Sequence, residues 1–390
     1  MVGTGVSVCE PFASALRRCR AENLAMGSWN EPDIGYWKGS REEYFKLYDF
    51  SAEAVLQAFP EARLGGPDTT GPGNSNAADF LRAFLEHCAH GKNYANGKTG
   101  SHVDFISFHA KGSPSWKDDH VEMGISRQLG SIQRGFEIIK SFPEWTHTPV
   151  VLGESDPEGC AACSAKDYPQ NSYRNGPLYG VYTLEALDKV LTLTQNENIN
   201  FLGAVTWAFE FEDLPYFAGY RELATNGVDK PVLNVFRMLG LLGRDRVEVV
   251  NPAALSAEQT LRDGVRGAPD IGAIATRSQR RMDVLVWNYH DDDVPFPNAS
   301  VDLRIAGLPE DANRALIEHF RLDATHSNAF TVWKEMGSPQ SPSAAAYSRL
   351  QQAGELQLVN SPAWISLSRG KADIQFALPR QGVSLLRLSW

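Results

Sequence analysis

The sequence predicts an α/β domain with a parallel sheet over residues 1–242, followed by an all-β domain of the sandwich type over residues 243–390. In the first part, short apolar runs alternate with amphipathic stretches, which is the pattern of repeated β–α units. After about residue 243, short strands follow one another with turn residues between them. A length of 390 residues with 43% hydrophobic side chains suffices for one large and one smaller domain.

Five apolar runs in the first part are short enough to be β-strands. Their interiors are apolar on both faces, as expected of covered parallel strands in a barrel or a doubly wound sheet. The runs are Leu24–Ser28, Ala62–Leu64, Val103–Phe108, Val150–Leu152 and Phe201–Trp207.

Helices are predicted between these strands. Ser40 and Glu43 form a capping box, in which each side chain accepts a hydrogen bond from a backbone N–H group of the other residue. Apolar residues recur at helical spacing after the box, and three further segments show similar spacing: Asp79–Cys88, Ile125–Lys140 and Pro177–Leu193.

The last part of the chain is predicted to consist of short strands with one helix, near Ser343–Gln352. This succession favours a β-sandwich. The expected strands are Val284–Tyr289, Val301–Ile305, Ala315–Phe320, Leu356–Val359, Ile374–Ala377 and Val383–Leu388.

The charge of the chain limits its partners. A formal net charge of -10 argues against a nucleic acid or an anionic membrane as partner, and fits a soluble enzyme that acts on a neutral substrate. No apolar run approaches the roughly 20 residues of a membrane helix. The first residues lack the apolar core of a signal peptide, and the localisation stays open. The sequence gives no indication of the oligomeric state.

Cys160 and Cys163 are the only cysteines in a C-x-x-C arrangement. A zinc site would require a second pair or histidines at matching spacing, and the sequence has neither. A local disulfide and two free thiols are the remaining interpretations, and no metal or organic cofactor is expected.

Two glutamates are the strongest candidates for catalysis. Glu31 lies at the C-terminal end of one predicted strand, within Trp29-Asn-Glu-Pro-Asp33, and Glu154 follows another. Active sites of (β/α)8 barrels lie at this end of the strands. A retaining glycosidase uses two carboxylates about 5 Å apart. We therefore expect Glu31 to protonate the leaving oxygen and Glu154 to act as the nucleophile.

Both segments also have a structural explanation. Pro32 and Asp33 are typical of the first turn of a helix. Asp156 and Pro157 are typical of an acidic turn. The two glutamates together, at matching strand ends, favour catalysis more than either does alone.

Further candidates for substrate binding follow the same strand ends. Asn30 would hydrogen-bond the 2-hydroxyl group of a sugar. His109 and Lys111 would bind sugar hydroxyls or a carboxylate, although a lone histidine at a strand end is more often structural.

The segment after the last strand contains an aromatic residue and two acidic ones. Trp207 would stack on a sugar ring or, alternatively, fill the core. Glu212 and Asp213 would hydrogen-bond sugar hydroxyls.

These motifs, in this order, resemble glycoside hydrolase family 39, whose main activities are β-xylosidase and α-L-iduronidase. The resemblance implies a (β/α)8 TIM-type barrel with Glu31 as acid/base after strand four, Glu154 as nucleophile after strand seven, and retention of configuration. It is carried by Trp29-Asn-Glu-Pro32, Arg63-Leu-Gly-Gly-Pro67, the His109 segment, Glu154, Asp229-Lys-Pro-Val-Leu233 and Trp287-Asn-Tyr289.

The sub-type is divided between two branches. The segments that contain Lys111 and Asp156 are more similar to the iduronidase branch, in which a lysine at the position of Lys111 and a downstream arginine hold the substrate carboxylate. Arg221 is the candidate arginine, and Asp156 is a further substrate-binding candidate. The segment Tyr216–Asn226 is similar to bacterial members called β-xylosidases.

The family barrel would place three β–α units, about 90 residues, before the strand that ends at Glu31. That strand begins at Leu24 here. We therefore expect an incomplete barrel in which strands four to eight are present, with apolar edges at Leu24–Ser28 and Phe201–Trp207.

Three functions are carried forward. The first is a retaining exo-glycosidase of the β-xylosidase type, whose substrate would be an oligosaccharide or a small glycoside. The second is an α-L-iduronidase-like enzyme, which would require Lys111 and an arginine for the uronic acid carboxylate. The third is an inactive fragment or a carbohydrate-binding protein, in which Glu154 would have no catalytic role.

Overall fold

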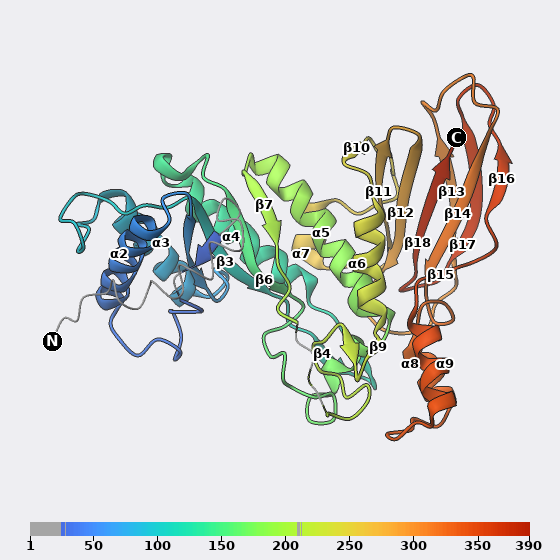
Figure 1. Cartoon of the computed structure of the whole chain (residues 1–390), viewed down its shortest axis with the longest axis horizontal. Coiled ribbons are helices and arrows are strands. Elements are labelled where there is room, and N and C mark those ends of the chain that lie inside the picture. Colours follow the sequence, from blue (N-terminus) through green and yellow to red (C-terminus); the bar gives the residue numbers. More distant parts are fainter. Residues whose placement is uncertain (1–24, 28, 209–210, 212) are drawn as a thin grey trace. The chain divides into compact units, whose positions relative to one another are not determined.

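The computed structural model describes residues 25–27, 29–208, 211 and 213–390 (Figure 1). They form two compact units. The first unit contains the described residues up to Lys111, Arg127–Asp156 and Val190–Thr206; the second contains Gly112–Ser126, Pro157–Lys189 and the described part of Trp207–Trp390. The domain boundary expected after residue 242 stays a prediction.

The first unit contains a five-stranded parallel sheet. Its strand order follows the chain without reversal, which is the order of consecutive barrel strands and differs from that of a doubly wound sheet. The strands, in sheet order, are β1 (Ala25–Gly27), β2 (Arg63–Thr69), β3 (Phe105–Lys111), β6 (Val150–Asp156) and β7 (Phe201–Ala204). Each of the five predicted strands has a counterpart, and β2, β3 and β6 extend past their expected C-terminal ends. The last strand, expected to reach Trp207, ends at Ala204 instead, and Leu24 and Ser28 of the first lie outside the described residues.

Helices follow the strands in sequence (Figure 1). The capping box at Ser40 is confirmed, because its hydroxyl accepts from Glu43 N at 3.2 Å and its N–H group donates to Glu43 Oε2 at 2.7 Å. The helices are α2 (Arg41–Ala58), α3 (Ser75–His90), α4 (Ile125–Lys140), the short 3-10 helix η2 (Pro143–Trp145) and α5 (Pro177–Glu197).

The parallel sheet is irregular where its strands end. The register between β2 and β3 shifts between Pro67 and Thr69, and the register between β3 and β6 shifts between Phe108 and Ala110. Such bulges redirect the side chain at the extra residue. The extra residue at the first shift is Asp68 of β2, and at the second shift Gly153 and Glu154 of β6 lie opposite His109 of β3. All four residues lie at the candidate site described below.

The second unit contains two antiparallel sheets besides two small hairpins. The larger has seven strands: β10 (Asp245–Val247), β11 (Asp270–Ser278), β12 (Arg281–Tyr289), β18 (Val383–Ser389), β14 (Arg314–Leu322), β15 (Gln357–Leu358) and β16 (Ala363–Ser366), which also pairs with β14. The smaller has β13 (Ala299–Ile305) and β17 (Ala372–Leu378). All six strands expected after residue 243 lie within these strands or overlap them.

A hydrophobic core joins the two sheets. Val284 and Leu386 of the larger sheet belong to the same buried cluster as Ile305 and Leu378 of the smaller one. Two sheets whose buried side chains share one core are packed as in a β-sandwich, as the sequence predicts.

The expectation of a single helix in this part is wrong. Besides α9 (Ala344–Gly354), which confirms the predicted helix, the structure contains α7 (Ala257–Asp263) and α8 (Ala329–Glu335). The start of α7 is a second capping box, between Ser256 and Gln259, in a polar segment without a long apolar face. β11 is also unexpected, because small residues occupy much of Asp270–Ser278 and weaken the usual strand pattern.

The remaining elements of the second unit are short. The hairpins pair β4 (Ser115–Lys117) with β5 (His120–Glu122) and β8 (Ala224–Thr225) with β9 (Val228–Asp229). The helices are η3 (Pro169–Asn175) and α6 (Pro231–Leu241). Phe217 and Val228 pack with α8 and α9 in a separate hydrophobic cluster.

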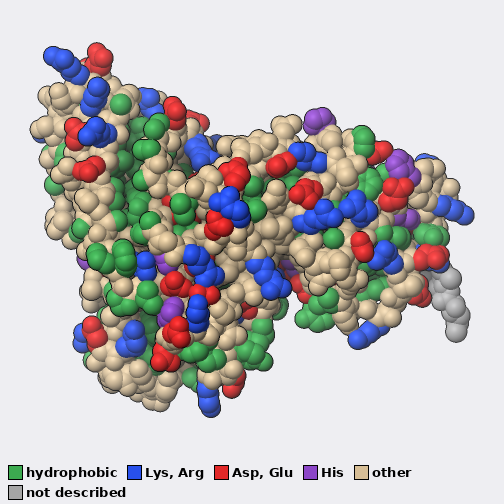
Figure 2. Space-filling model, turned by 180° about the vertical axis from the view of Figure 1, so that it is seen from behind, with side chains coloured by type: hydrophobic (Ala, Val, Ile, Leu, Met, Phe, Trp, Pro, Cys, Tyr) green, Lys and Arg blue, Asp and Glu red, His purple; other side chains and the backbone are tan. Residues whose placement is uncertain are grey.

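The surface carries charges of both signs. Acidic and basic side chains are interspersed over the face seen in Figure 2. Within the described part of the chain, none of the helices combines the length and the continuous apolar character that a bilayer crossing requires.

Candidate active site

Glu31 and Glu154 come from the C-terminal ends of two different strands of the parallel sheet. Glu31 follows β1, and its N–H group donates to the carbonyl oxygen of Asp68 at 2.9 Å. Its backbone has φ 48°, a region that non-glycine residues adopt rarely and that is concentrated at functional sites. Glu154 lies on β6, and both carboxyl side chains keep a small exposed surface, 13% and 12%.

His109 connects the two carboxylates. Its Nδ1 lies 2.9 Å from Glu31 Oε1 and 3.8 Å from Glu154 Oε2. The three ligand atoms all lie within 4.8 Å of one another, so the carboxylates share one small site. The His109 ring itself is buried, with 2% of its surface exposed. The structure therefore brings the two glutamates and His109 together, and their roles stay predictions.

One nitrogen and two carboxylate oxygens at this spacing could also hold a metal ion. The site already contains a cationic side chain, because Lys111 Nζ contacts Glu154 Oε2 and lies 3.2 Å from Asp156 Oδ2. The positive charge of the lysine opposes a second cation at the same carboxylate.

Lys111 and Asp156 lie beside the nucleophile candidate. Asp156 is almost fully buried, with 1% of its side chain exposed, and Thr206 Oγ1 donates to its Oδ1 at 2.5 Å. The lysine thus links two neighbouring carboxylates of β6. Gln128 of α4 donates to the carbonyl oxygen of Ala110 at 3.1 Å, which fixes the strand between His109 and Lys111.

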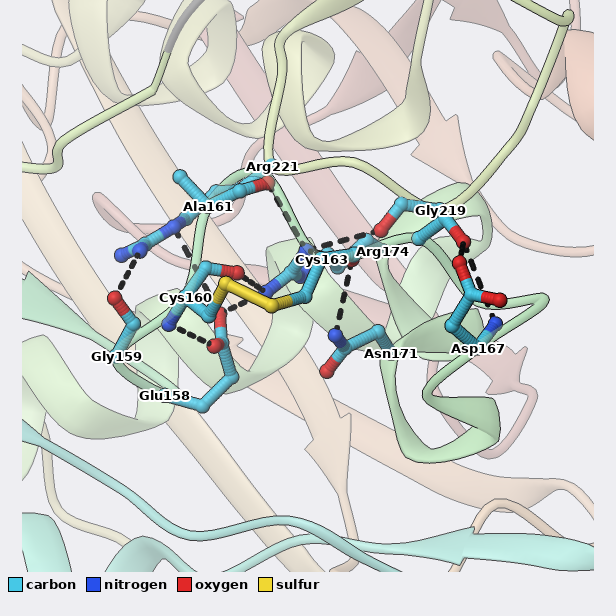
Figure 3. The surroundings of a disulfide bond; sticks show 11 residues. Glu158, Gly159, Cys160, Ala161, Cys163, Asp167, Asn171, Arg174, Gly219 and Arg221 are labelled. Atoms are coloured by element: carbon cyan, nitrogen blue, oxygen red, sulfur yellow. Dashed lines mark hydrogen bonds and ion pairs between the residues drawn. A yellow bond between two sulfur atoms is a disulfide. The ribbon is translucent and has the colours of Figure 1, made fainter.

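Arg221 and Trp207 lie in the second unit. The guanidinium carbon of Arg221 lies 5.6 Å from the centre of the Trp207 ring, which is 40% exposed. Arg221 itself is fully buried; its Nε lies 3.7 Å from Glu158 Oε1, and its Nη2 donates to the carbonyl oxygen of Gly159 at 3.3 Å (Figure 3). The expected uronate-binding arginine is therefore engaged by an acidic residue of its own unit.

The loop that holds Arg221 is closed by a disulfide between Cys160 and Cys163 (Figure 3). The disulfide alternative of the sequence is confirmed. Arg174 donates to the carbonyl oxygens of both cysteines, at 2.6 and 3.1 Å, and forms an ion pair with Glu158. Two buried arginines thus share one carboxylate and the backbone of this loop.

The other predicted site residues are less engaged. Asn30 is exposed beside Glu31, and Asp213 is exposed in a turn with φ 58°. Glu212 lies outside the described residues. Their expected contacts with sugar hydroxyls stay predictions.

Asp68 is a site residue that the sequence prediction missed. It lies at the C-terminal end of β2, the strand between β1 and β3, and so at the same edge as the two glutamates. Burial raises its pKa, and the nearby Glu154 carboxylate raises it further, although the Ser107 hydroxyl and His109 act in the opposite direction. The available signal was its position, one residue after Gly-Gly-Pro at a strand end.

Two carboxyl groups at the C-terminal ends of strands of one parallel sheet are the arrangement that retaining glycoside hydrolases use. Residues 21–365 match the family model described as Glycosyl hydrolases family 39. The chain belongs to this family, as its motifs predicted.

Relatives with both family activities are similar to the chain. It is 24% identical to a β-xylosidase of Caldicellulosiruptor saccharolyticus over 84% of its length, and 25% identical to the α-L-iduronidase of Mus musculus over 93%. It spans 60% and 57% of the length of these relatives.

Solved structures show the same fold. A bacterial orthologue of human α-L-iduronidase superposes with a TM-score of 0.78 at 17% identity, over 98% of this chain and 64% of that one. A monomeric β-xylosidase of Caulobacter crescentus CB15 superposes with a TM-score of 0.72 at 19% identity, over 98% of this chain and 74% of the other.

Proposed function

We propose that this chain is a retaining exo-glycosidase of the β-xylosidase type, with Glu31 as general acid/base and Glu154 as nucleophile. The observation that carries the proposal is the short distance between the two carboxylates, whose nearest oxygens lie within 4.8 Å. Retaining enzymes hold their carboxyl groups about 5–5.5 Å apart, whereas inverting enzymes need about 6.5–9.5 Å to admit a water molecule.

The reaction would proceed in two displacements. Glu31 donates its proton to the leaving oxygen while a Glu154 oxygen bonds to the anomeric carbon and the glycosidic bond breaks. Glu31 then takes a proton from water, whose oxygen attacks the anomeric carbon and releases Glu154. His109 holds Glu31 Oε1, which leaves Oε2 for the proton transfers.

We also infer that the five parallel strands form a sector of a (β/α)8 barrel. The unreversed strand order supports this inference. Glu31 and Glu154 would then lie at the C-terminal face, where barrels of this kind carry their active sites.

A neutral sugar such as xylose fits the charges of the site. A uronide needs cations for its carboxylate, but Lys111 is paired with Glu154 and Asp156, and Arg221 with Glu158. A uronate would have to compete with these carboxylates. A xyloside leaves the pairs intact, which favours it as the substrate.

An α-L-iduronide is the second candidate, on one observation. The Lys111 side chain keeps 15% of its surface exposed, directly beside the nucleophile candidate. A substrate carboxylate could therefore reach its ammonium group.

The test compares an aryl β-D-xyloside with an aryl α-L-iduronide. We expect hydrolysis of the xyloside, with the β-anomer as the first product in the NMR spectrum, and loss of turnover in Glu154→Gln. Glu137→Gln, which removes an exposed glutamate paired with Arg134, is the matched control and should keep its activity. Preference for the iduronide would favour the second candidate. No turnover of either, with no effect of Glu154→Gln on sugar binding, would favour a binding protein or an inactive fragment.

A further inference from the structure

Asp68 contacts the supports of both catalytic candidates. Its carbonyl oxygen accepts the backbone N–H group of Glu31 at 2.9 Å. Its own φ is 51°, and the register of β2 against β3 shifts at this residue, so its side chain is redirected at the strand end. Ser107, two residues before His109 on β3, lies near enough to the Asp68 carboxyl group to lower its pKa.

Two glycines make room for this carboxyl group. A Cβ atom at Gly27 of β1 would lie 2.2 Å from Asp68 Oδ2. A Cβ atom at Gly153 of β6 would lie 2.9 Å from Asp68 Oδ1 and 2.9 Å from His109 Cδ2. All three distances are shorter than real Cβ atoms show. The carboxyl group and the histidine ring therefore share the space above Gly153, the residue that precedes Glu154.

The groups that face Asp68 come from three strands. β1 presents Gly27, which has no charge; β3 presents Ser107 and His109; and β6 presents Gly153 and the charge of Glu154. Lys111 and Asp156 lie next along β3 and β6, paired with each other. Asp68 thus adds a carboxyl group to a site that already contains those of Glu31, Glu154 and Asp156, and the charge of Glu154 raises the pKa of Asp68.

We propose that Asp68 is a positioning residue of this site: its backbone holds Glu31, and its carboxyl group fixes the His109 ring and places a negative charge beside Glu154. This inference rests on the proposed function, in which Glu154 must be ionised to attack the sugar. The Asp68 carboxyl group therefore adds one negative charge to the site, and this charge should affect how activity depends on pH.

The first test is the pH profile of kcat/KM in Asp68→Asn. Asparagine keeps the shape of the aspartate side chain but removes its charge. The acid limb of the profile should move to lower pH, because one negative charge is removed from the site. Loss of kcat/KM by the same factor at every pH, with an unmoved limb, would show a merely structural role and overturn the inference.

Asp104→Asn is the matched control. Asp104 lies just before β3, and its carboxylate accepts the N–H group of Leu64 at the start of β2, at 2.8 Å. Asp104→Asn therefore removes the same charge at the opposite end of β2 and β3. This variant should leave the acid limb of the pH profile in place. A limb that moves as far in Asp104→Asn would attribute the shift to net charge and contradict the inference.

The second test does not require turnover. With ¹³C-labelled aspartate, the Asp68 carboxyl resonance, assigned by its loss in Asp68→Asn, is titrated in the parent and in Glu154→Gln. The pKa of Asp68 should fall in Glu154→Gln, because a neighbouring negative charge is removed. An unchanged titration would overturn the inference whatever the activity. A parent that cleaves no glycoside but shows this coupling would overturn the proposed function and support the charge contact.

Discussion

Glu185 is a fully buried carboxyl group of the second unit. Trp287 Nε1 donates to its Oε2 at 2.8 Å, and Lys189 Nζ lies 3.2 Å from its Oε1. The same ammonium group lies 2.6 Å from Asp270 Oδ2, so one cation pairs with two buried carboxyl groups. Burial therefore raises the pKa of Glu185 from 4.5 to about 8, despite the opposing charge of Lys189.

This shift makes the stability of the folded protein depend on pH. In the unfolded chain the Glu185 carboxyl group loses its proton near pH 4.5, whereas the folded protein retains the proton up to about pH 8. The folded state binds more protons between these values, so the free energy of unfolding falls as the pH rises. The stabilisation is complete below pH 4.5 and is lost as the pH passes 8. At about 1.4 kcal/mol per pH unit, the full change is about 5 kcal/mol.

Glu185→Gln should remove this dependence, because the amide oxygen can still accept from Trp287 and no proton is bound or released. Urea unfolding followed by tryptophan fluorescence at pH 5, 6, 7 and 8 measures the effect. The parent should lose about 1 kcal/mol more per pH unit than the variant. Glu197→Gln, at the end of the same helix, breaks a surface pair with Lys140 and should cost at most about 1 kcal/mol. Parallel pH slopes in parent and Glu185→Gln would refute the reasoning.

Three further predictions concern the site and its loop. Glu31→Gln should lower kcat/KM about 10²–10⁴-fold for a xyloside with a poor leaving group, and far less for a dinitrophenyl xyloside, whose leaving group needs no proton; equal losses would contradict the acid role. Cys160→Ser with Cys163→Ser should lower the free energy of unfolding by about 2 kcal/mol, from the entropy of a four-residue loop, in thermal melts compared under non-reducing conditions; an unchanged melting temperature would contradict this. Gly153→Ala should have a larger effect on kcat than on the melting temperature, because the added Cβ atom would displace the His109 ring. A fall in the melting temperature without a fall in kcat would argue against that contact.

The sequence predicted the parallel sheet because each of its strands has a local signal. Val150–Leu152 is a short apolar run, and the structure extends it to Asp156. The extension contains Glu154. Its residues are small or polar, so a search for apolar runs does not detect it as part of the strand. The same limitation explains why β11 was not predicted. Many of its residues are small, and it pairs with β12, which is strongly apolar. A strand stabilised mainly by its neighbours gives a weak signal in its own sequence.

The catalytic candidates were predictable for a related reason. Glu31, His109 and Glu154 follow strand ends, and parallel strands bring their C-terminal ends to one edge. Asp68 follows the same rule but was missed, because its strand continues through Gly-Gly-Pro, which is typical of a turn. Its role depends on space left by Gly27 and Gly153, which lie on two other strands.

Which side chains pair with the cations of the site could not be predicted from the sequence. These pairings matter most for the kind of substrate that the site accepts. Lys111 in the sequence favours a uronide, because a lysine at this position holds a carboxylate in the iduronidase branch. In the structure the same ammonium group is paired with Glu154 and Asp156, two residues of the neighbouring strand. A substrate carboxylate would gain one charged contact at the cost of weakening others, since the three carboxylates would share a single cation. A lysine near a nucleophile therefore indicates an acidic substrate only where its charge is not already balanced, and here the balance favours a neutral sugar.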